Sequence, residues 1–387
     1  MTSQHTRATT SQPSAGDEPA GDDQQRTGEA APTADDAERR RAHAHAALLA
    51  WYAREGRAGL PWRATRDPYA ILVSEVMLQQ TQVERVIPKY LAFLERFPTL
   101  AALAEAPTAD VIRAWAGLGY NMRAVRLQEV ARQAQRDFGG QLPSALDNLM
   151  RLKGIGRYTA GAVAAFAFGA PIATVDTNIR RTLWRILRGV EPAVWPSGER
   201  AARETLALAE WALPPGRAYD WQQALMDLGA TICVARRPAC ERCPLRDCCA
   251  AWAEVAAVTL FPSGEALARL RAERASAAGS ASTEARVAEG AAPYTTPRRR
   301  QAQPFTSTTR YYRGRIIVAL RALAPGASLS LGELGPLVKP DYHAEDDLPW
   351  LRRLVEGLAR DGLARLSDAE NAEGESADPA GRRVSLP

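Results

Sequence analysis

Amphipathic periodicity is the feature that most restricts how this 387-residue chain can fold. Between residues 42 and 261, apolar side chains recur at the i, i+3, i+4, i+7 spacing of half-buried helices. One such stripe covers 83–94, and Pro88 inside it predicts a kink or a break. A second stripe covers 179–190, and the period-two alternation of strands is absent from this body. We therefore predict an all-α unit at 41–261.

The segments on either side of this body differ from it in composition. Residues 1–40 hold almost no large apolar side chains, so they cannot bury enough surface to offset the entropy of ordering. We expect a disordered tail there. Residues 262–304 are again rich in Ala, Ser, Glu, Arg and Pro, which predicts a linker.

A small separate domain is expected at 305–387. The pattern there predicts helices at 312–323, 331–338 and 348–360 and strands at 363–366 and 383–386. Three helices followed by a β-hairpin are the element order of a winged helix, which is the fold we expect for this domain.

Charge is distributed unevenly along the chain. The formal net charge is +5, yet the first 38 residues carry eight acids and two arginines, so the remainder carries +11. A basic body is compatible with a polyanionic partner, although a solvated basic surface explains it equally well. No apolar run is long enough to span a bilayer, and the N-terminal segment lacks the apolar stretch of a secretory signal. We expect a cytoplasmic protein with no membrane partner.

All five cysteines fall within seventeen residues, and four of them fit the spacing C-x6-C-x2-C-x5-C. These four are Cys233, Cys240, Cys243 and Cys249, with Cys248 able to replace Cys249. Disulfides are not expected without an export signal, and structural zinc sites usually bring two close cysteine pairs where this chain has one. Four thiolates at irregular short spacing suit the four iron atoms of a cubane cluster. The spacing favours an iron–sulfur cluster and leaves zinc as the alternative.

A glycine-bracketed turn enters a helix of small residues at 152–161. Gly154 and Gly156 permit a tight turn and the close approach of a phosphate, and Lys153 adds a positive charge at the edge of the turn. This pattern is typical of a helix-hairpin-helix element. Asp176 lies fifteen residues after Gly161, where it can cap the next helix, and a capping role alone is the simplest interpretation of it.

Glu75 lies among apolar residues near the start of a strongly hydrophobic helix. A buried glutamate has a raised pKa and can hold a proton at neutral pH for general-acid catalysis. A partly exposed helix face is the ordinary alternative for a glutamate. The polar run 79–82 that follows, Gln-Gln-Thr-Gln, is unusual for a core helix, and its amides suit hydrogen bonds to base edges.

The segment from Leu60 to about Pro262 resembles the adenine DNA glycosylase (MutY) family of the helix-hairpin-helix superfamily. The motifs that carry the resemblance are Pro61-Trp62-Arg63, Ser74 to Val83, Gly117-Leu118-Gly119-Tyr120, the hairpin, Val175-Asp176-Thr177-Asn178 and the cysteine set. The resemblance implies a helix-hairpin-helix DNA glycosylase fold with two helical subdomains and a cleft between them. It places a six-helix barrel at about 69–180 and a cluster subdomain at 41–68 and 181–261, with a [4Fe-4S] cluster on the four cysteines.

The resemblance also implies roles for individual residues. Glu75 matches the general acid that protonates N7 of adenine, and Asp176 matches the carboxylate that stabilises the positively charged sugar in a retaining-type mechanism. Tyr158 and Asn178 match residues that support this pair. The positions that match DNA-contacting or adenine-contacting residues are Arg63, Leu78, Gln79, Gln80, Thr81, Tyr120, Lys153, Gly154, Gly156 and Gln223.

Among these positions, Gln80 and Tyr120 are expected to insert into the duplex and help to extrude adenine. Arg63, Leu78 and Gln223 are expected to line the adenine pocket. The implied substrate is double-stranded DNA with adenine mispaired with 8-oxoguanine or guanine, bound by a monomer at the nucleoid in base-excision repair.

Three alternatives stay open. A bifunctional glycosylase–lyase resembling endonuclease III needs a lysine nucleophile at the position of Tyr158, and this chain has only three lysines. A thymine or uracil mismatch glycosylase can carry the same Tyr and Asp, although the glutamine run favours adenine. A non-enzymatic iron–sulfur DNA-binding regulator would have no need of the pair formed by Glu75 and Asp176.

Two departures from the family pattern bear on function. Asn121 follows Tyr120 where relatives often carry a second tyrosine. No Nudix-type Gly…Glu…Arg-Glu run follows residue 262, so we expect a short form in which the winged helix takes that place. That domain is expected either to grip flanking duplex or to serve packing alone. The preference for 8-oxoguanine or guanine opposite adenine is left open.

Overall fold

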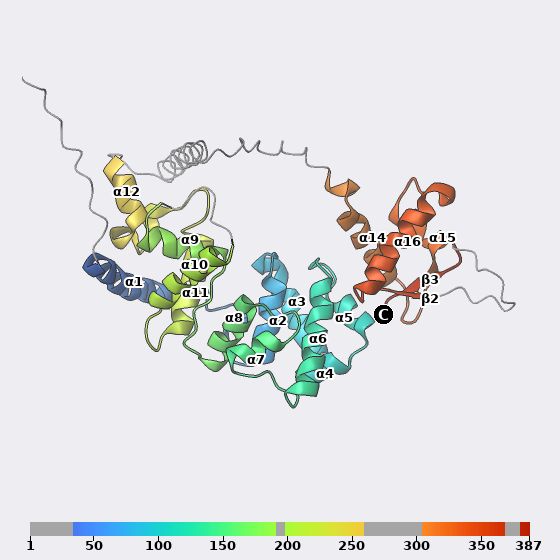
Figure 1. Ribbon diagram of the computed structural model, residues 1–387, viewed down its shortest axis with the longest axis horizontal. Coiled ribbons are helices and arrows are strands. Elements are labelled where there is room, and N and C mark those ends of the chain that lie inside the picture. The colour runs from blue at the N-terminus through green and yellow to red at the C-terminus, as the bar shows by residue number, and fades with distance from the viewer. Residues whose placement is uncertain (1–33, 191–197, 259–303, 368–379) are drawn as a thin grey trace, which may run out of the picture.

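The computed structural model describes residues 34–190, 198–258, 304–367 and 380–387. Most of these residues are helical, and the strands among them are confined to the C-terminal part (Figure 1). The prediction of an all-α body is confirmed. The predicted tail up to residue 33 and the predicted linker up to residue 303 lie outside the described residues. No helix in the described ranges is long and apolar enough to cross a membrane.

The first helical body surrounds a central helix, α2. Its helices are α2 (Pro68–Leu78), α3 (Val83–Arg96), α4 (Leu100–Glu105), α5 (Thr108–Ala114), α6 (Met122–Asp137), α7 (Leu146–Arg151) and α8 (Arg157–Phe168). Asp67 caps α2 by accepting two backbone N–H groups of its first turn, and Pro68 begins the helix. Every residue of α2 from Tyr69 to Met77 is buried, because α3, α6 and α8 all pack on it. A helix that is buried all round is therefore the frame that holds Glu75.

Helix α3 continues through Pro88, so of the predicted kink or break, the break does not occur. A proline inside a helix removes one hydrogen bond at a cost of about 3 kcal/mol. Val86, Tyr90 and Phe93 on the same helix are buried, and burial of each such side chain contributes roughly 1.5–3 kcal/mol. The free energy gained by packing this apolar face outweighs the cost of the proline.

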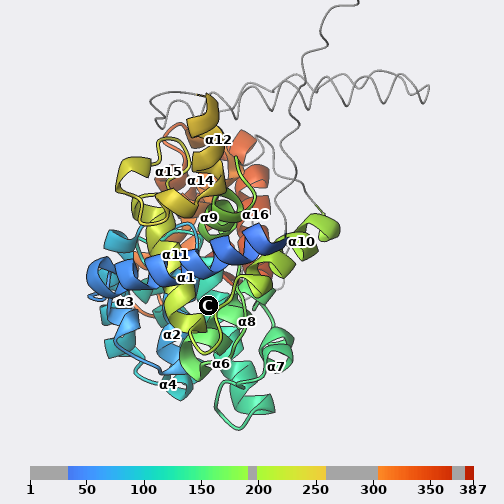
Figure 2. The same ribbon diagram turned by 90° about the vertical axis from the view of Figure 1, so that its left-hand side faces the viewer.

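The second helical body combines the first described helix with later segments. Its helices are α1 (Ala34–Glu55), α9 (Thr177–Leu187), α10 (Glu199–Trp211), α11 (Ala218–Thr231) and α12 (Ala250–Val258). α1 crosses α11 (Figure 2) and places Leu48 and Trp51 in the core that α9 and α11 share. Because α9 belongs to this core, the division between the two bodies falls between Phe166 and Ala173, before the predicted residue 180.

The first turns of α1 belong to the segment predicted to be disordered, so that prediction is wrong for residues 34–40. Arg40 donates a hydrogen bond to the carbonyl oxygen of Cys248 at 3.0 Å, and the Trp211 indole donates to Glu38 at 3.2 Å. These partners are distant in sequence. The local composition therefore could not reveal the contacts that order these turns.

The third body is C-terminal and contains all the described strands. Its elements are α14 (Thr309–Arg321), β1 (Leu329–Ser330), α15 (Leu331–Val338), α16 (Ala344–Arg360), β2 (Arg365–Ser367) and β3 (Arg383–Ser385). β3 pairs antiparallel with both β1 and β2. The helices and the hairpin follow the predicted winged-helix order, whereas the two-residue β1 was not predicted because it is too short to show alternation. Ile112 of α5 completes the core of this body, so the third body packs against the first.

Candidate active site and nucleic-acid interface

Glu75 is buried within α2, with 8% of its surface exposed. Burial raises the pKa of Glu75 to about 7; the negative charge of Asp176 acts in the same direction, and a hydrogen bond with Tyr158 opposes it. A carboxyl group with this pKa is protonated in a large fraction of molecules at neutral pH. It can therefore donate a proton to a bound group.

Tyr158, in the first turn of α8, is the hydrogen-bond partner of Glu75. α8 can lie against α2 because its buried face consists largely of alanine and glycine between Ala160 and Ala165. Burial raises the pKa of Tyr158 well above its ordinary value, so its hydroxyl keeps its proton and acts as a donor. The Tyr158 hydroxyl thus holds the Glu75 carboxyl group in place.

Asp176 caps α9, as the sequence predicts, because its Oδ1 accepts a hydrogen bond from the Ile179 backbone at 2.6 Å. The Asn178 side-chain amide donates to Asp176 Oδ2 at 3.3 Å. Burial raises the pKa of Asp176, although these hydrogen bonds and Arg181 act to lower it. Capping is not the whole role of Asp176, because the same carboxylate contributes to the raised pKa of Glu75.

Arg181 links Asn178 to the first cysteine. Its Nη2 donates to Asn178 Oδ1 at 2.9 Å and to the Gly229 carbonyl oxygen at 2.8 Å, and its Nε donates to the Cys233 carbonyl oxygen at 2.9 Å. A Cβ at Gly229 would lie 2.8 Å from the Asn178 Cβ, so α11 can approach α9 this closely only with glycine. The orientation of Asn178, and with it Asp176, therefore depends on the backbone of the cysteine segment.

Two loops follow α2 and α5, and we name them the Gln80 loop (79–82) and the Tyr120 loop (117–121). Gln80 and Tyr120 have φ angles of 55° and 46°, and in the described ranges they are the non-glycine residues with positive φ. Such backbone geometry costs about 1–3 kcal/mol and clusters at functional sites. Both side chains are exposed, Tyr120 by 42%. These are the two residues expected to insert into the duplex, and that role stays a prediction.

Arg123, buried at the start of α6, joins the two loops. Its guanidinium donates hydrogen bonds to three places: the C-terminal end of α2, the Gln80 loop and the Tyr120 loop. The acceptors, at 2.6–3.2 Å, are the carbonyl oxygens of Val76, Met77, Gln79, Leu118 and Gly119 and the hydroxyl of Thr81. The same guanidinium lies 5.4 Å from the centre of the Tyr120 ring. One buried cation thus holds both loops.

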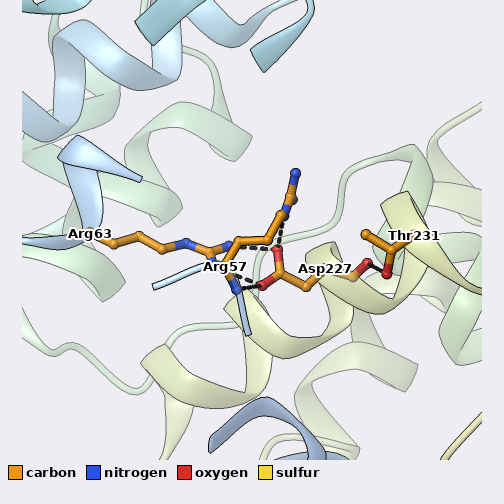
Figure 3. Close-up of polar contacts among 4 residues, drawn as sticks. All are labelled: Arg57, Arg63, Asp227 and Thr231. Carbon is orange, nitrogen blue, oxygen red and sulfur yellow. Dashed lines mark hydrogen bonds and ion pairs between the residues drawn. The ribbon is translucent and has the colours of Figure 1, made fainter. Parts of the chain in front are cut away.

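Arg63, expected in the adenine pocket, forms a buried ion pair with Asp227 (Figure 3). Two guanidinium nitrogens of Arg63 donate to the two Asp227 oxygens at 2.7 and 2.8 Å. Arg57 donates to the same carboxylate from its backbone at 2.9 Å and from Nε at 2.6 Å. Burial alone would raise the pKa of Asp227, but the two arginines lower it. Arg63 therefore fixes the segment before α2 to α11, and a contact with adenine stays a prediction.

The other two expected pocket residues lie on helices of different bodies. Leu78 ends α2 and is partly buried against the first core. Gln223 is buried on α11, one helical turn before Asp227. Their place around adenine stays a prediction.

The predicted hairpin joins α7 to α8 at the surface. Gly154 has a φ of 100°, which its lack of a Cβ permits, and a Cβ there would lie 3.4 Å from the Arg126 side chain. Gly156 is extended and precedes α8, and nothing lies within 4 Å of the position its Cβ would take. Lys153 is exposed, with its backbone N–H bonded to Gln133 at 2.8 Å. The turn therefore presents an open helix N-terminus beside a cation.

Four cysteines line one cavity in the second body. They are Cys233, Cys240, Cys243 and Cys249, the four that fit the spacing. Cys248 lies in the second hydrophobic core instead, where its thiol donates to the Leu245 carbonyl oxygen at 3.5 Å. Among the residues that the structure describes, no group of three or more His, Cys, Asp or Glu side chains is placed to hold a metal ion. Of the two neighbouring cysteines, Cys249 is the one that faces the cavity.

Comparison with known proteins assigns the chain to a family. Residues 73–205 match the model of the HhH-GPD superfamily base excision DNA repair protein. The chain is 38% identical over 324 residues to the adenine DNA glycosylase of Mycobacterium tuberculosis strain H37Rv, and the match covers 82% of this chain and 88% of that protein. The chain belongs to the adenine DNA glycosylase family. It is thus a base-excision DNA glycosylase, an N-glycosyl hydrolase that acts on adenine.

Two further similarities agree with this family. The human adenine DNA glycosylase is 43% identical over 226 residues, which cover 56% of this chain and 41% of the human protein, so the chain matches less than half of that relative's length. A solved structure of a thermostable thymine-DNA glycosylase has a TM-score of 0.52 and 31% identity, covering 56% of this chain and 98% of that one. The predicted helix-hairpin-helix DNA glycosylase fold is confirmed.

Three buried or half-buried charged residues of the site were not predicted from the sequence: Arg123, Arg181 and Asp227. Each lies on a helix whose neighbouring positions are buried. A buried charge must be paired or hydrogen-bonded. A charged residue among buried helix positions was therefore the signal that could have indicated an important contact. The partners of Arg123 and Asp227 come from separate helices and loops, so the pattern could mark these residues without revealing their role.

Proposed function

We propose that this enzyme hydrolyses the N-glycosidic bond of adenine opposite 8-oxoguanine or guanine in double-stranded DNA, with Glu75 as the general acid. The observation that carries the proposal is the pKa of Glu75, which burial and the nearby charge of Asp176 raise to about 7. Two carboxyl groups in unequal environments can divide the duties of acid and cation stabiliser.

In this mechanism Glu75 gives its proton to N7 of adenine, and the C1′–N9 bond breaks as adenine leaves with the bonding electrons. The Asp176 carboxylate stabilises the positive charge on the sugar, either as an ion pair or through a transient bond to C1′. Water then adds to C1′ and returns a proton to Glu75. Tyr158 orients the acid, and Asn178 holds Asp176 through its 3.3 Å hydrogen bond.

The residue types favour a monofunctional enzyme. Lyase chemistry requires an amine to attack C1′, and the position where a bifunctional relative would carry that lysine is Tyr158. Lys153 is exposed on the hairpin. We assign it to a phosphate contact, together with the backbone of Gly154 and Gly156.

We assign a [4Fe-4S] cluster to these four cysteines, because their residues line one cavity and such a cluster takes one cysteine for each iron. The cluster would supply a rigid cross-link between segments and take no part in breaking the glycosidic bond. Cys233 would be one ligand, and Arg181 holds its backbone. Monomeric action in the cytoplasm at the nucleoid stays a prediction.

Single-turnover excision on duplexes with adenine opposite 8-oxoguanine, guanine, cytosine or thymine tests the proposal. Glu75→Gln and Asp176→Asn keep the shape of each side chain, and both variants should bind mispaired DNA yet excise adenine about 10²–10⁴-fold more slowly. Glu95→Gln, which removes an exposed acid on α3, is the matched control and should excise normally. Rapid excision by either site variant would refute the assignment.

The lyase and thymine alternatives need separate assays. Borohydride should trap no enzyme on mispaired DNA, because no lysine occupies the position of Tyr158. Duplexes with guanine opposite thymine or uracil should be left intact. Efficient trapping would establish a lyase, and release of thymine or uracil would establish the other branch of the superfamily.

A further inference from the structure

Two arginines of α14, the first α-helix of the C-terminal body, contact two adjacent residues of the Tyr120 loop. The Arg310 guanidinium lies 4.0 Å from the centre of the Tyr120 ring. Arg321 Nη2 donates to Asn121 Oδ1 at 2.8 Å. The Tyr120 loop is thus contacted by side chains of two helices, α14 and α6, because Arg123 at the start of α6 also donates hydrogen bonds to it.

This contact belongs to a packed junction between the first and third bodies. Ile112 of α5 is fully buried in the core of the C-terminal body. Arg113 donates to the Leu323 carbonyl oxygen at 3.4 Å, and the Ala109 backbone donates to the Pro387 carbonyl oxygen at 3.2 Å. Because the core itself is shared, α14 is held in a defined place beside the loop.

The Tyr120 loop needs such support. Tyr120 has a positive φ, and a strained residue keeps that geometry only where its surroundings over-determine it. An exposed aromatic ring gains little from burial, so a guanidinium over its face is one of the few interactions that can restrain it.

Asn121 supplies the acceptor for the second arginine of α14. Its amide oxygen accepts the 2.8 Å hydrogen bond from Arg321 Nη2. An aliphatic side chain at 121 would offer no acceptor, so this hydrogen bond depends on the residue type. The Tyr120 loop is therefore tied to α14 at two adjacent residues.

We propose that the C-terminal domain positions Tyr120 for insertion into the duplex, with Arg310 restraining its ring and Arg321 restraining Asn121. This inference rests on the proposed excision of adenine from mispairs. Arg310 and Arg321 are positioning residues, because they act through the loop. A mispair-reading residue in one body would then depend on side chains from another.

A double-mutant cycle on the full-length protein tests the role of Arg310. Arg310→Met should reduce the ratio of excision rates between the 8-oxoguanine·A mispair and an A·T pair several-fold. In a Tyr120→Leu background the same substitution should change the ratio no further, since Arg310 acts through that ring. Additive losses would mean that Arg310 binds DNA independently and would overturn the proposal. Arg315→Met removes the same charge from the same helix and should leave the ratio unchanged.

Hydrogen exchange in the DNA-free protein tests the Arg321 contact without any excision assay. Amides in 117–123 should exchange several-fold faster in Arg321→Met and in Asn121→Leu, whereas Asn121→Asp keeps an acceptor and should exchange like the wild type. Unchanged exchange in both disruptive variants would sink the positioning role. A wild-type enzyme that excised no adenine from mispairs would defeat the proposed function instead, while the exchange result would still decide this contact.

Discussion

Gln80 and Tyr120 lie on separate loops, yet both hold left-handed backbone angles beside carbonyl groups bonded by the same Arg123 guanidinium. Strain at an exposed residue is retained only when buried partners hold it. Arg123 is such a partner, with six acceptors spread over the end of α2 and both loops. Side chains held in this way would need little further ordering for the proposed insertion into DNA.

Replacement of this buried cation should disturb both loops at once. Arg123→Met should lower the free energy of unfolding by about 3 kcal/mol, because several buried carbonyl groups lose their donor. It should also reduce the preference for mispaired over paired duplex in binding titrations. Arg132→Met, on the same helix, removes hydrogen bonds to Ala104 and Thr108 only. The Arg132→Met control should lose stability but keep the preference for mispaired over paired duplex. If both variants showed the same preference, Arg123 would not hold the two loops in their binding geometry.

The raised pKa of Glu75 predicts how stability depends on pH. Its folded-state pKa of about 7 exceeds the ordinary 4.5, so its favourable contribution is complete below pH 4.5 and is lost as pH rises through 7. The loss is about 3 kcal/mol. Glu75→Gln should therefore melt at a higher temperature than wild type at pH 8, with the difference shrinking toward pH 5. An unchanged difference across this range would show that Glu75 titrates normally.

The same pKa predicts the pH dependence of catalysis. The general acid must be protonated, so single-turnover excision by the wild type should decline as pH rises above about 7. Rates measured from pH 5 to 9 on one mispaired duplex provide the test. A rate that stayed level to pH 9 would speak against Glu75 as the proton donor.

The carboxylate of Asp227 should matter more for stability than that of its neighbour Asp220. Asp227→Asn leaves Arg57 and Arg63 without their countercharge, and breaking a buried pair costs about 3–5 kcal/mol. Asp220 lies on the same helix as Asp227, and Asp220→Asn breaks its exposed ion pair with Arg217. An exposed pair of this kind contributes only about 0–1 kcal/mol to stability. Urea unfolding at pH 7 compares the two. Because the arginines lower the pKa of Asp227, its contribution is present above the unfolded pKa and should fade in acid.

Two adjacent cysteines allow a matched test of the cluster. Cys249 lines the cavity with the other three thiols, whereas Cys248 is packed in the core. Cys249→Ser should lose iron and the brown near-visible absorption of an iron–sulfur protein, and Cys248→Ser should retain both. Iron and sulfide analysis of the purified variants gives the answer. Tightly bound zinc in place of iron would instead support the alternative metal.

Much of the candidate site could be recognised along the chain because its residues sit in contiguous motifs. Glu75 stands in an apolar helix, Asp176 stands where a cap is needed, and the cysteines are closely spaced. Arg123 and Asp227 could not be assigned in this way, since their partners lie on other helices and loops. The helical start of α1 was missed for the same reason, because its contacts come from α10 and the cysteine segment.

The helical class, the hairpin, the two carboxyl groups and the cysteine set could all be predicted from the residues along the chain. Each is a local property of spacing or residue type, which follows from helical periodicity and ligand chemistry. Three features follow from the three-dimensional packing instead: burial raises the pKa of Glu75, Cys249 rather than Cys248 faces the cavity, and α14 contacts Tyr120. Desolvation and long-range contacts depend on which surfaces meet in three dimensions, and no pattern along one chain specifies that.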